Sequence, residues 1–304
     1  MLPLFFCMKH IIILLINMLK NKFILGGAQF GNKYGAFNKD NEVNLQKLTC
    51  IINFAKKNHL NFIDTSPDYG NSESMIGNLN TKNFKIITKI PKIENTREDP
   101  KKVIEKIIEK SLNNLKTNNL YGILFRSPSY LLKEPFFSIW EEAKKLKRKN
   151  LFKKVGITIY EPDELDLVFE KLKPEIVQFP YNLFDQRMKN SGWIDVLYKK
   201  EVELHARSVF LQGLLLTKYK DFPAKFSQFQ SEWFQYHNWL KKNNISAIDA
   251  CINFILLEKK ITKIIVGIES VQQLREIVNI KFKNIIYSNW KKNIDEKLYN
   301  PLKW

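Results

Sequence analysis

The chain has 304 residues, of which 44% are hydrophobic and 26% charged, and its formal net charge is +18. This composition provides enough apolar surface for a large buried core and excludes a disordered chain, since no long polar tract interrupts it. The three cysteines show no CxxC spacing, which excludes a disulfide framework and a zinc site. We therefore predict a cytoplasmic protein with no bound metal.

The basic residues are spread along the chain. Runs such as Lys199-Lys200 and Lys259-Lys260 lie at predicted helix ends and turns, where solvated charge is ordinary. A nucleic-acid site should instead concentrate Lys and Arg in one place with aromatic residues between them. Despite the high net charge, we predict no nucleic-acid partner.

Residues 1–20, MLPLFFCMKHIIILLINMLK, form an apolar N-terminal extension. Lys9 and His10 interrupt it, and no small-residue cleavage site follows. Its longest apolar run, 11–16, is far shorter than the roughly 20 residues that span a bilayer. Met18 precedes the first predicted strand, so we interpret residues 1–17 as the product of an upstream start-codon assignment and expect no stable membrane insertion. A membrane anchor is the alternative.

From residue 21 onward, short apolar runs alternate with longer amphipathic segments, which predicts repeated βα units. The predicted strands are 23–28, 61–65, 85–89, 120–125, 153–158, 176–179, 203–207 and 263–266. The predicted helices are 44–58, 72–79, 100–116, 136–149, 161–171, 190–200, 246–258 and 270–278. An additional amphipathic helix, 226–242, precedes the eighth strand, and a basic, aromatic tail covers 279–304.

Eight βα units can close into a (β/α)8 TIM barrel, whereas a doubly wound open sheet would require its nucleotide loop after the first strand. The sequence GGAQFG follows that strand and lacks the GxGxxG spacing. No repeat or linker marks a second domain. We therefore predict an α/β protein whose residues 21–304 form one barrel domain with an extra helix and a C-terminal tail.

Ionisable residues follow three consecutive predicted strands, at the barrel end where active sites lie. Asp64 ends the second strand, Tyr69 lies in the loop after it, Lys89 ends the third strand and Arg126 ends the fourth. A phenol ionises near a pKa of about 10, so a tyrosine proton donor needs a neighbouring cation that favours the phenolate. Lys89 can be that cation, and Asp64 can keep it charged.

The segments LGGAQFGNKYG, FIDTSPDYGNSE, IITKIP, VQFPYNLFDQR, HARSVFLQGLLL and IIVGIESVQQL, in this order, resemble the aldo-keto reductase superfamily from about residue 23 to the C-terminus. The resemblance implies binding of a nicotinamide cofactor without a Rossmann domain and hydride transfer to a small-molecule aldehyde or ketone. It implies Tyr69 as general acid, Lys89 as the residue that tunes the tyrosine pKa, and Asp64 as the partner of Lys89.

Arg126 departs from the family pattern, which ends the fourth strand in a histidine. Arginine also donates hydrogen bonds, but as a permanent cation on a longer side chain. We interpret Arg126 either as a residue that binds an anionic or sugar-derived substrate or as the mark of a cofactor-binding barrel with weak or no turnover.

The resemblance also implies a set of cofactor contacts. Thr158-Ile159 replaces the usual Ser-Asn after the fifth strand, and Arg207 is expected to point toward the cofactor. The resemblance favours NADP(H). Glu269 stands where NADP-using relatives often have a base, and a carboxylate there would repel a 2′-phosphate, so NAD(H) remains the alternative. The residues that fall on cofactor positions are Gln178, Ser208, Leu211, Gly213, Gly267, Ser270, Gln273 and Glu276.

Overall fold

The structure is a computed structural model, and it describes residues 19–32, 34–37, 43–93, 98–283, 285, 287 and 294–304. Eight parallel strands form a closed barrel in which each strand pairs with the next in sequence and β8 pairs with β1. This confirms the predicted (β/α)8 fold. The strands are β1 (Phe23–Gly26), β2 (Phe62–Asp64), β3 (Lys85–Ile90), β4 (Leu120–Arg126), β5 (Phe152–Thr158), β6 (Ile176–Pro180), β7 (Glu203–Arg207) and β8 (Lys263–Gly267).

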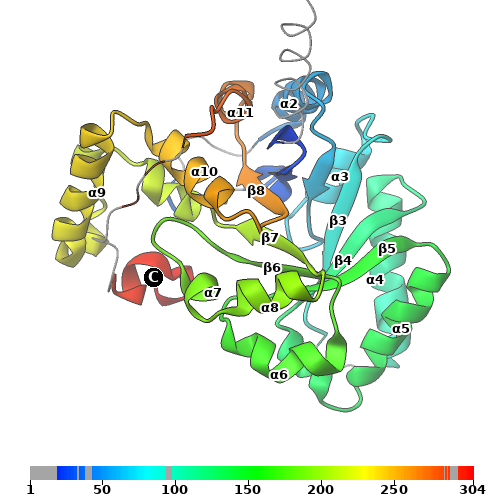
Figure 1. Ribbon diagram of the computed structural model, residues 1–304. Helices are drawn as coiled ribbons and strands as arrows, with labels where there is room; N and C mark the ends of the chain where they lie inside the picture. The colour runs from blue at the N-terminus through cyan, green and yellow to red at the C-terminus, as the bar shows by residue number, and fades with distance from the viewer. Residues whose placement is uncertain are drawn as a thin grey trace, which may run out of the picture.

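Helices surround the barrel, as Figure 1 shows, and α9 stands at the periphery beside the C-terminal segment. Short 3-10 turns, including Gly27–Gln29, Leu211–Leu216 and Ala224–Phe229, occupy several loops. The helices are α2 (Leu45–Lys57), α3 (Ser72–Gly77), α4 (Pro100–Leu115), α5 (Phe137–Arg148), α6 (Asp163–Leu172), α7 (Arg187–Asn190), α8 (Trp193–Lys199), α9 (Gln230–Lys242), α10 (Ala247–Leu257), α11 (Val271–Val278) and α12 (Glu296–Tyr299).

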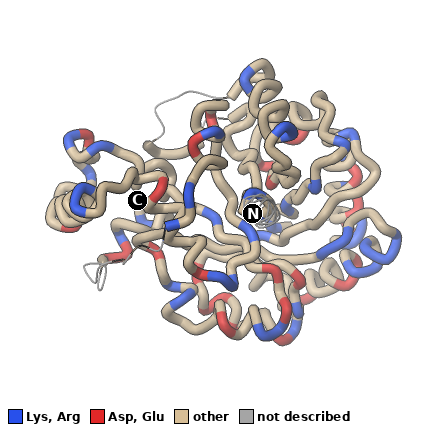
Figure 2. Tube along the Cα trace, turned by 45° about the horizontal axis from the view of Figure 1, so that its top comes forward, with Lys and Arg blue, Asp and Glu red and all other residues tan. Residues whose placement is uncertain are grey.

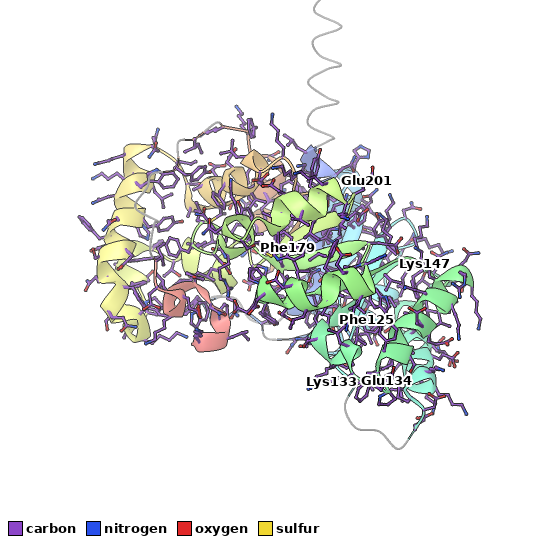
Figure 3. All side chains as sticks on the ribbon, turned by 60° about the horizontal axis from the view of Figure 1, so that its bottom comes forward. Phe125, Lys133, Glu134, Lys147, Phe179 and Glu201 are labelled. Carbon is purple, nitrogen blue, oxygen red and sulfur yellow. The ribbon has the colours of Figure 1, made fainter. Side chains whose placement is uncertain are left out.

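The barrel strands are apolar on both faces because each face packs against something different. The outward side chains join the large core beneath the helices; Phe125, for example, lies 5.4 Å from Trp140, measured between ring centroids. In Figure 3 the labelled Phe125 and Phe179 lie within the body of the molecule, while charged side chains such as Lys147 and Glu201 lie at its edge. The inward side chains form a smaller cluster inside the barrel, made of Ile24, Phe62, Ile87, Leu124, Ile176 and Ile265.

Two of the predicted helices differ in detail from the structure. The segment 190–200 is not one helix, because Gly192 adopts φ +81 and separates α7 from α8. The inserted helix begins at Gln230, and the first part of the predicted segment belongs to the 3-10 turn that precedes it. The C-terminal tail contributes α12 and a short turn, Pro301–Lys303.

Most of the N-terminal extension, residues 1–18, lies outside the described residues. Within the part of the chain that the structure describes, no helix is long and apolar enough to cross a membrane. Lysines and arginines occur on many elements and alternate with acidic residues along the chain trace (Figure 2). This scattered arrangement of charge is what the sequence led us to expect.

Candidate active site

Asp64 and Lys89 form a buried ion pair at the C-terminal end of the barrel. Both side chains point inward from adjacent strands, β2 and β3, and each residue is 3% exposed. The Lys89 ammonium also donates to the Thr65 carbonyl at 3.1 Å. Burial by itself would lower the pKa of Lys89, but the Asp64 carboxylate and the Tyr69 hydroxyl outweigh burial and raise it. Lys89 is therefore held as a cation inside the barrel.

Tyr69 lies in the loop after β2, next to this ion pair. Its backbone N–H donates to the Ser66 carbonyl at 3.0 Å, and the next residue, Gly70, turns the chain with φ +55. A Cβ on Gly70 would stand 2.9 Å from the backbone oxygen of Gly31, so this close loop contact requires glycine. The turn places the Tyr69 ring 4.9 Å from Lys89 Nζ, measured to the ring centroid. The Lys89 ammonium and the Tyr69 ring therefore lie side by side at the C-terminal end of the barrel.

Arg126 extends from the end of β4 and pairs with Asp68, in the loop that carries Tyr69. Its Nη1 donates to Asp68 Oδ2 at 2.6 Å, and both side chains remain partly exposed. The phenols of Tyr160 and Tyr69 are close enough to contribute, with Asp68, to the raised pKa of Arg126. Arg126 is thus a neutralised cation at the mouth of the barrel, beside the proposed proton donor.

Five side chains surround this mouth and form what we call the ring. In the order of the strands that carry them, they are Tyr34, Tyr69, Arg126, Tyr160 and Arg207, and Tyr34 and Tyr69 close the ring. Arg126 is followed around the ring by Tyr160, whose aromatic ring lies 4.3 Å below the guanidinium of Arg207. Partial burial and the nearby Tyr69 raise the pKa of the Tyr34 phenol, although Tyr34 is 44% exposed, while the charge of Arg207 acts in the opposite direction. The rings of Tyr34 and Tyr69 are 6.4 Å apart.

The ring opens into a cavity that is lined by the ends of several barrel strands and by the loops that follow them. Polar and apolar side chains that converge on one concave site are the usual setting of a small-molecule binding site. It extends from Asp64, Lys89 and the ring to Gly267, Glu269 and Gln273 near the start of α11.

A profile of the aldo/keto reductase family matches residues 22–292, nearly the whole described barrel. The chain belongs to the aldo/keto reductase family. It is 23% identical to L-galactose dehydrogenase of Arabidopsis thaliana over 280 residues, a match that covers 83% of this chain and 82% of the relative. Membership places the protein among carbonyl-reducing oxidoreductases.

Solved aldo-keto reductase structures share the fold. The holo form of aldo-keto reductase AKR11C1 from Bacillus halodurans superposes with a TM-score of 0.69 at 16% identity, covering 85% of this chain and 86% of that one. The glycerol dehydrogenase AKR11B4 from Gluconobacter oxydans gives a TM-score of 0.67 at 17% identity, covering 87% of this chain and 88% of that one.

The structure brings five of the eight predicted cofactor residues of this aldo/keto reductase to the cavity wall: Gln178, Ser208, Gly213, Gly267 and Gln273. Gln178 also contacts the buried ion pair, since its Nε2 donates to Asp64 Oδ2 at 2.8 Å. The other three predicted residues lie elsewhere. Leu211 is buried in the core, Ser270 caps α11 through the Gln273 N–H, and Glu276 is exposed and accepts a hydrogen bond from Gln272.

Gln29 is a wall residue that sequence reasoning missed. It is buried in the turn after β1, and its Oε1 has no hydrogen-bond partner among the described residues. Its amide fits against Gly267, where a Cβ would stand 2.4 Å from Gln29 Nε2. A buried amide oxygen without a protein partner is usually satisfied by an ordered water, an ion or a ligand. The GGAQFG segment was the available signal, but no spacing rule singles out its glutamine.

Proposed function

We propose that this protein reduces the carbonyl group of a small aldehyde or ketone to an alcohol, with a reduced nicotinamide dinucleotide as cofactor. The observation that supports this proposal most strongly is the buried Lys89, placed between the Asp64 carboxylate and the Tyr69 phenol at the floor of a large cavity. Keeping a lysine buried and charged is costly, and such arrangements are concentrated at catalytic sites.

In this mechanism Tyr69 donates its phenolic proton to the substrate carbonyl oxygen as the carbon accepts a hydride. A bound nicotinamide supplies that hydride when the cofactor is present. Lys89 stabilises the resulting phenolate, and Asp64 holds Lys89 in position. Arg126, paired with Asp68, has further N–H groups at the mouth and orients the substrate.

Several residues of the cavity wall support the binding of a dinucleotide. Gly213 and Gly267 lack side chains that would obstruct the approach of a ligand, and the Gln29 oxygen is available as a hydrogen-bond acceptor. Ser208 and Gln273 line the same wall, and we assign these residues to the cofactor. Leu211, Ser270 and Glu276 do not line the cavity, so we assign them no direct contact with the cofactor.

The cofactor preference that we propose is NAD(H), although the family resemblance favours NADP(H). Glu269 lines the cavity close to Gln273 and is only 5% exposed. A carboxylate accepts hydrogen bonds from ribose hydroxyls and repels a 2′-phosphate. The cations on the cavity wall, Lys89, Arg126 and Arg207, lie at the ends of strands β3, β4 and β7, and none of them belongs to α11.

Polyhydroxylated carbonyl compounds are the substrates that we would test first. Two of the relatives are named for sugar or polyol oxidation, L-galactose dehydrogenase and glycerol dehydrogenase. The mouth has the character of a sugar site, since it combines aromatic faces with charged hydrogen-bonding groups. The Arg126–Asp68 pair offers both a donor and an acceptor to a hydroxyl group.

The direct test is oxidation of NADH and NADPH by the purified protein against a panel of aldehydes, ketones and sugar derivatives. Tyr69→Phe should reduce kcat by roughly 10²–10⁴-fold, the contribution typical of general acid catalysis. Cofactor binding, measured by fluorescence titration, should be unchanged. Tyr198→Phe, which changes an exposed tyrosine of α8, is the matched control. Equal rates for wild type and Tyr69→Phe would exclude the assigned mechanism.

The alternative function is a cofactor-binding barrel with little turnover, and Arg126 is the observation behind it. Here its guanidinium is engaged with Asp68. Arg126→His restores the residue of the family pattern. Activity that appears only in this variant would support the non-catalytic alternative, whereas wild-type activity that the variant lowers would support the reductase.

A further inference from the structure

Arg207 is the cation at the cavity mouth that forms no ion pair with a carboxylate of the described residues. The other two cations on the cavity wall are neutralised, since Lys89 pairs with Asp64 and Arg126 with Asp68. Arg207 donates only to neutral acceptors, the Ile159 carbonyl at 2.9 Å and the Ser208 hydroxyl at 3.2 Å. Among the residues that the structure describes, no acidic side chain forms an ion pair with it.

The position of Arg207 is fixed from several sides. It ends β7, where its backbone lies in register with Pro180, and its carbonyl accepts from the Tyr181 N–H at 3.0 Å. Its guanidinium plane rests on the Tyr160 ring. Two of its nitrogens are held by Ile159 and Ser208, so the side chain is oriented before any ligand arrives. A pre-oriented, half-buried guanidinium fits a planar anion well.

We propose that Arg207 binds an anionic oxygen group of the substrate, a carboxylate or a phosphate, so that the protein acts on carbonyl compounds that carry an acidic group. This inference rests on the proposed reductase function and specifies its substrate class. It also moves the anion site away from Arg126, the residue that the sequence suggested, because Asp68 already balances that charge.

The placement of Arg207 sets a requirement on the substrate. Arg207 ends β7, Tyr34 follows β1 and Tyr69 follows β2, so the strand order β7-β8-β1-β2 of the closed barrel places Tyr34 between the other two around the ring. A carbonyl at Tyr69 and an anion at Arg207 must therefore be separated by the space beside Tyr34. The acidic group belongs several bonds from the reacting carbon, which excludes 2-oxo acids and suits semialdehydes, uronates and sugar phosphates.

The test compares matched substrates that differ only in charge, in a buffer free of phosphate. Succinate semialdehyde is paired with butanal, and glyceraldehyde 3-phosphate with glyceraldehyde. In the wild type we expect kcat/KM to favour the anionic member of at least one pair by about tenfold or more. Arg207→Gln should reduce this ratio by about 10- to 100-fold, the effect of losing one charged hydrogen-bonding pair.

Two further variants show whether the ratio of kcat/KM between anionic and neutral substrates depends on Arg207 itself or on net charge. Arg207→Lys keeps the charge and loses the planar fork, so it should retain part of the preference. Arg148→Gln removes one positive charge from an exposed position at the end of α5 and should leave the ratio unchanged. A ratio near one in the wild type, or an unchanged ratio in Arg207→Gln, would overturn the proposal.

A binding measurement separates this proposal from the reductase function and from a cofactor contact. Thermal shift in the presence of cofactor compares gluconate with sorbitol, and stabilisation by gluconate that Arg207→Gln abolishes supports the anion site even where no substrate is turned over. Equal stabilisation by both compounds would overturn it. Weaker binding of NADH by Arg207→Gln, with an unchanged substrate ratio, would assign Arg207 to the cofactor diphosphate and also overturn it.

Discussion

The side-chain amide of Gln178 donates a hydrogen bond to Asp64 at 2.8 Å, so the carboxylate that holds Lys89 is itself held from across the barrel. One oxygen of Asp64 faces Lys89 and the other faces Gln178. Strands β2, β3 and β6 thus contribute to one rigid cluster beneath Tyr69. The surroundings of Tyr69, the proposed proton donor, are therefore built from residues far apart in the sequence.

Asp64→Asn should move the alkaline limb of the kcat/KM profile to lower pH. In the wild type, Asp64 and Tyr69 raise the pKa of Lys89 above its ordinary value despite burial, so Lys89 stays charged through the working range. Without the carboxylate, burial dominates and lowers this pKa. Lys89 then loses its proton earlier as pH rises, and stabilisation of the Tyr69 phenolate is lost with it.

The measurement is the pH dependence of kcat/KM for wild type and Asp64→Asn. Asp195→Asn, on the exposed face of α8, removes a carboxylate outside the cavity and is the control. An alkaline limb at the same pH in both proteins would show that Asp64 does not govern the protonation of Lys89.

The barrel, and the position of Asp64, Lys89 and Arg126 at its C-terminal end, were predictable from the sequence because both follow from short-range patterns. Apolar runs set the strands, and a strand end fixes where Asp64, Lys89 and Arg126 point. The Arg126–Asp68 pair was not predictable, since Asp68 lies in a loop whose path depends on Gly70 and Gly31. The break at Gly192 was missed because the apolar spacing continues across it. The hydrogen bond between Gln178 and Asp64 was missed because the two residues lie 114 positions apart in the sequence.

Glu203→Gln should destabilise the fold and reduce its sensitivity to acid. Glu203 points into the lower part of the barrel, where it accepts hydrogen bonds from Tyr121 at 2.6 Å and from Lys154 at 2.7 Å. It also contacts His205 at 3.1 Å. Burial raises the pKa of Glu203, but these partners outweigh burial and bring it to about 2.

The lowered pKa of Glu203 determines how the stability of the fold changes with pH. Glu203 stabilises the folded protein above its unfolded pKa of about 4.3, and this contribution disappears as pH falls toward 2. Because the group is partly solvated, we expect a loss of about 2 kcal/mol at neutral pH in Glu203→Gln. Urea unfolding at pH 7 and at pH 3 measures both effects. Equal loss at the two pH values would contradict the assigned role.

Gly267→Ala should weaken cofactor binding while leaving the fold intact. A Cβ at this position would stand 2.4 Å from Gln29 Nε2, closer than any real contact. The end of a flexible side chain must then move, and the cavity is the space that Gln29 faces. We expect the Kd for NADH to rise by about tenfold, with little change in Tm. Gly192→Ala, where the new Cβ meets no atom within 4 Å but the backbone has φ +81, should lower the Tm through backbone strain and leave the Kd for NADH unchanged.

Glu269→Gln should change the choice between the two cofactors. The carboxylate lines the cavity near the start of α11 and repels a 2′-phosphate, so its removal should improve kcat/KM for NADPH by about tenfold, the effect of roughly 1.4 kcal/mol. NADH should be used less well, since the ribose hydroxyl loses its strongest acceptor. Glu109→Gln, an exposed change of equal charge on α4, controls for the net charge. A wild type that already prefers NADPH, with a preference that Glu269→Gln does not alter, would instead place the 2′-phosphate away from Glu269.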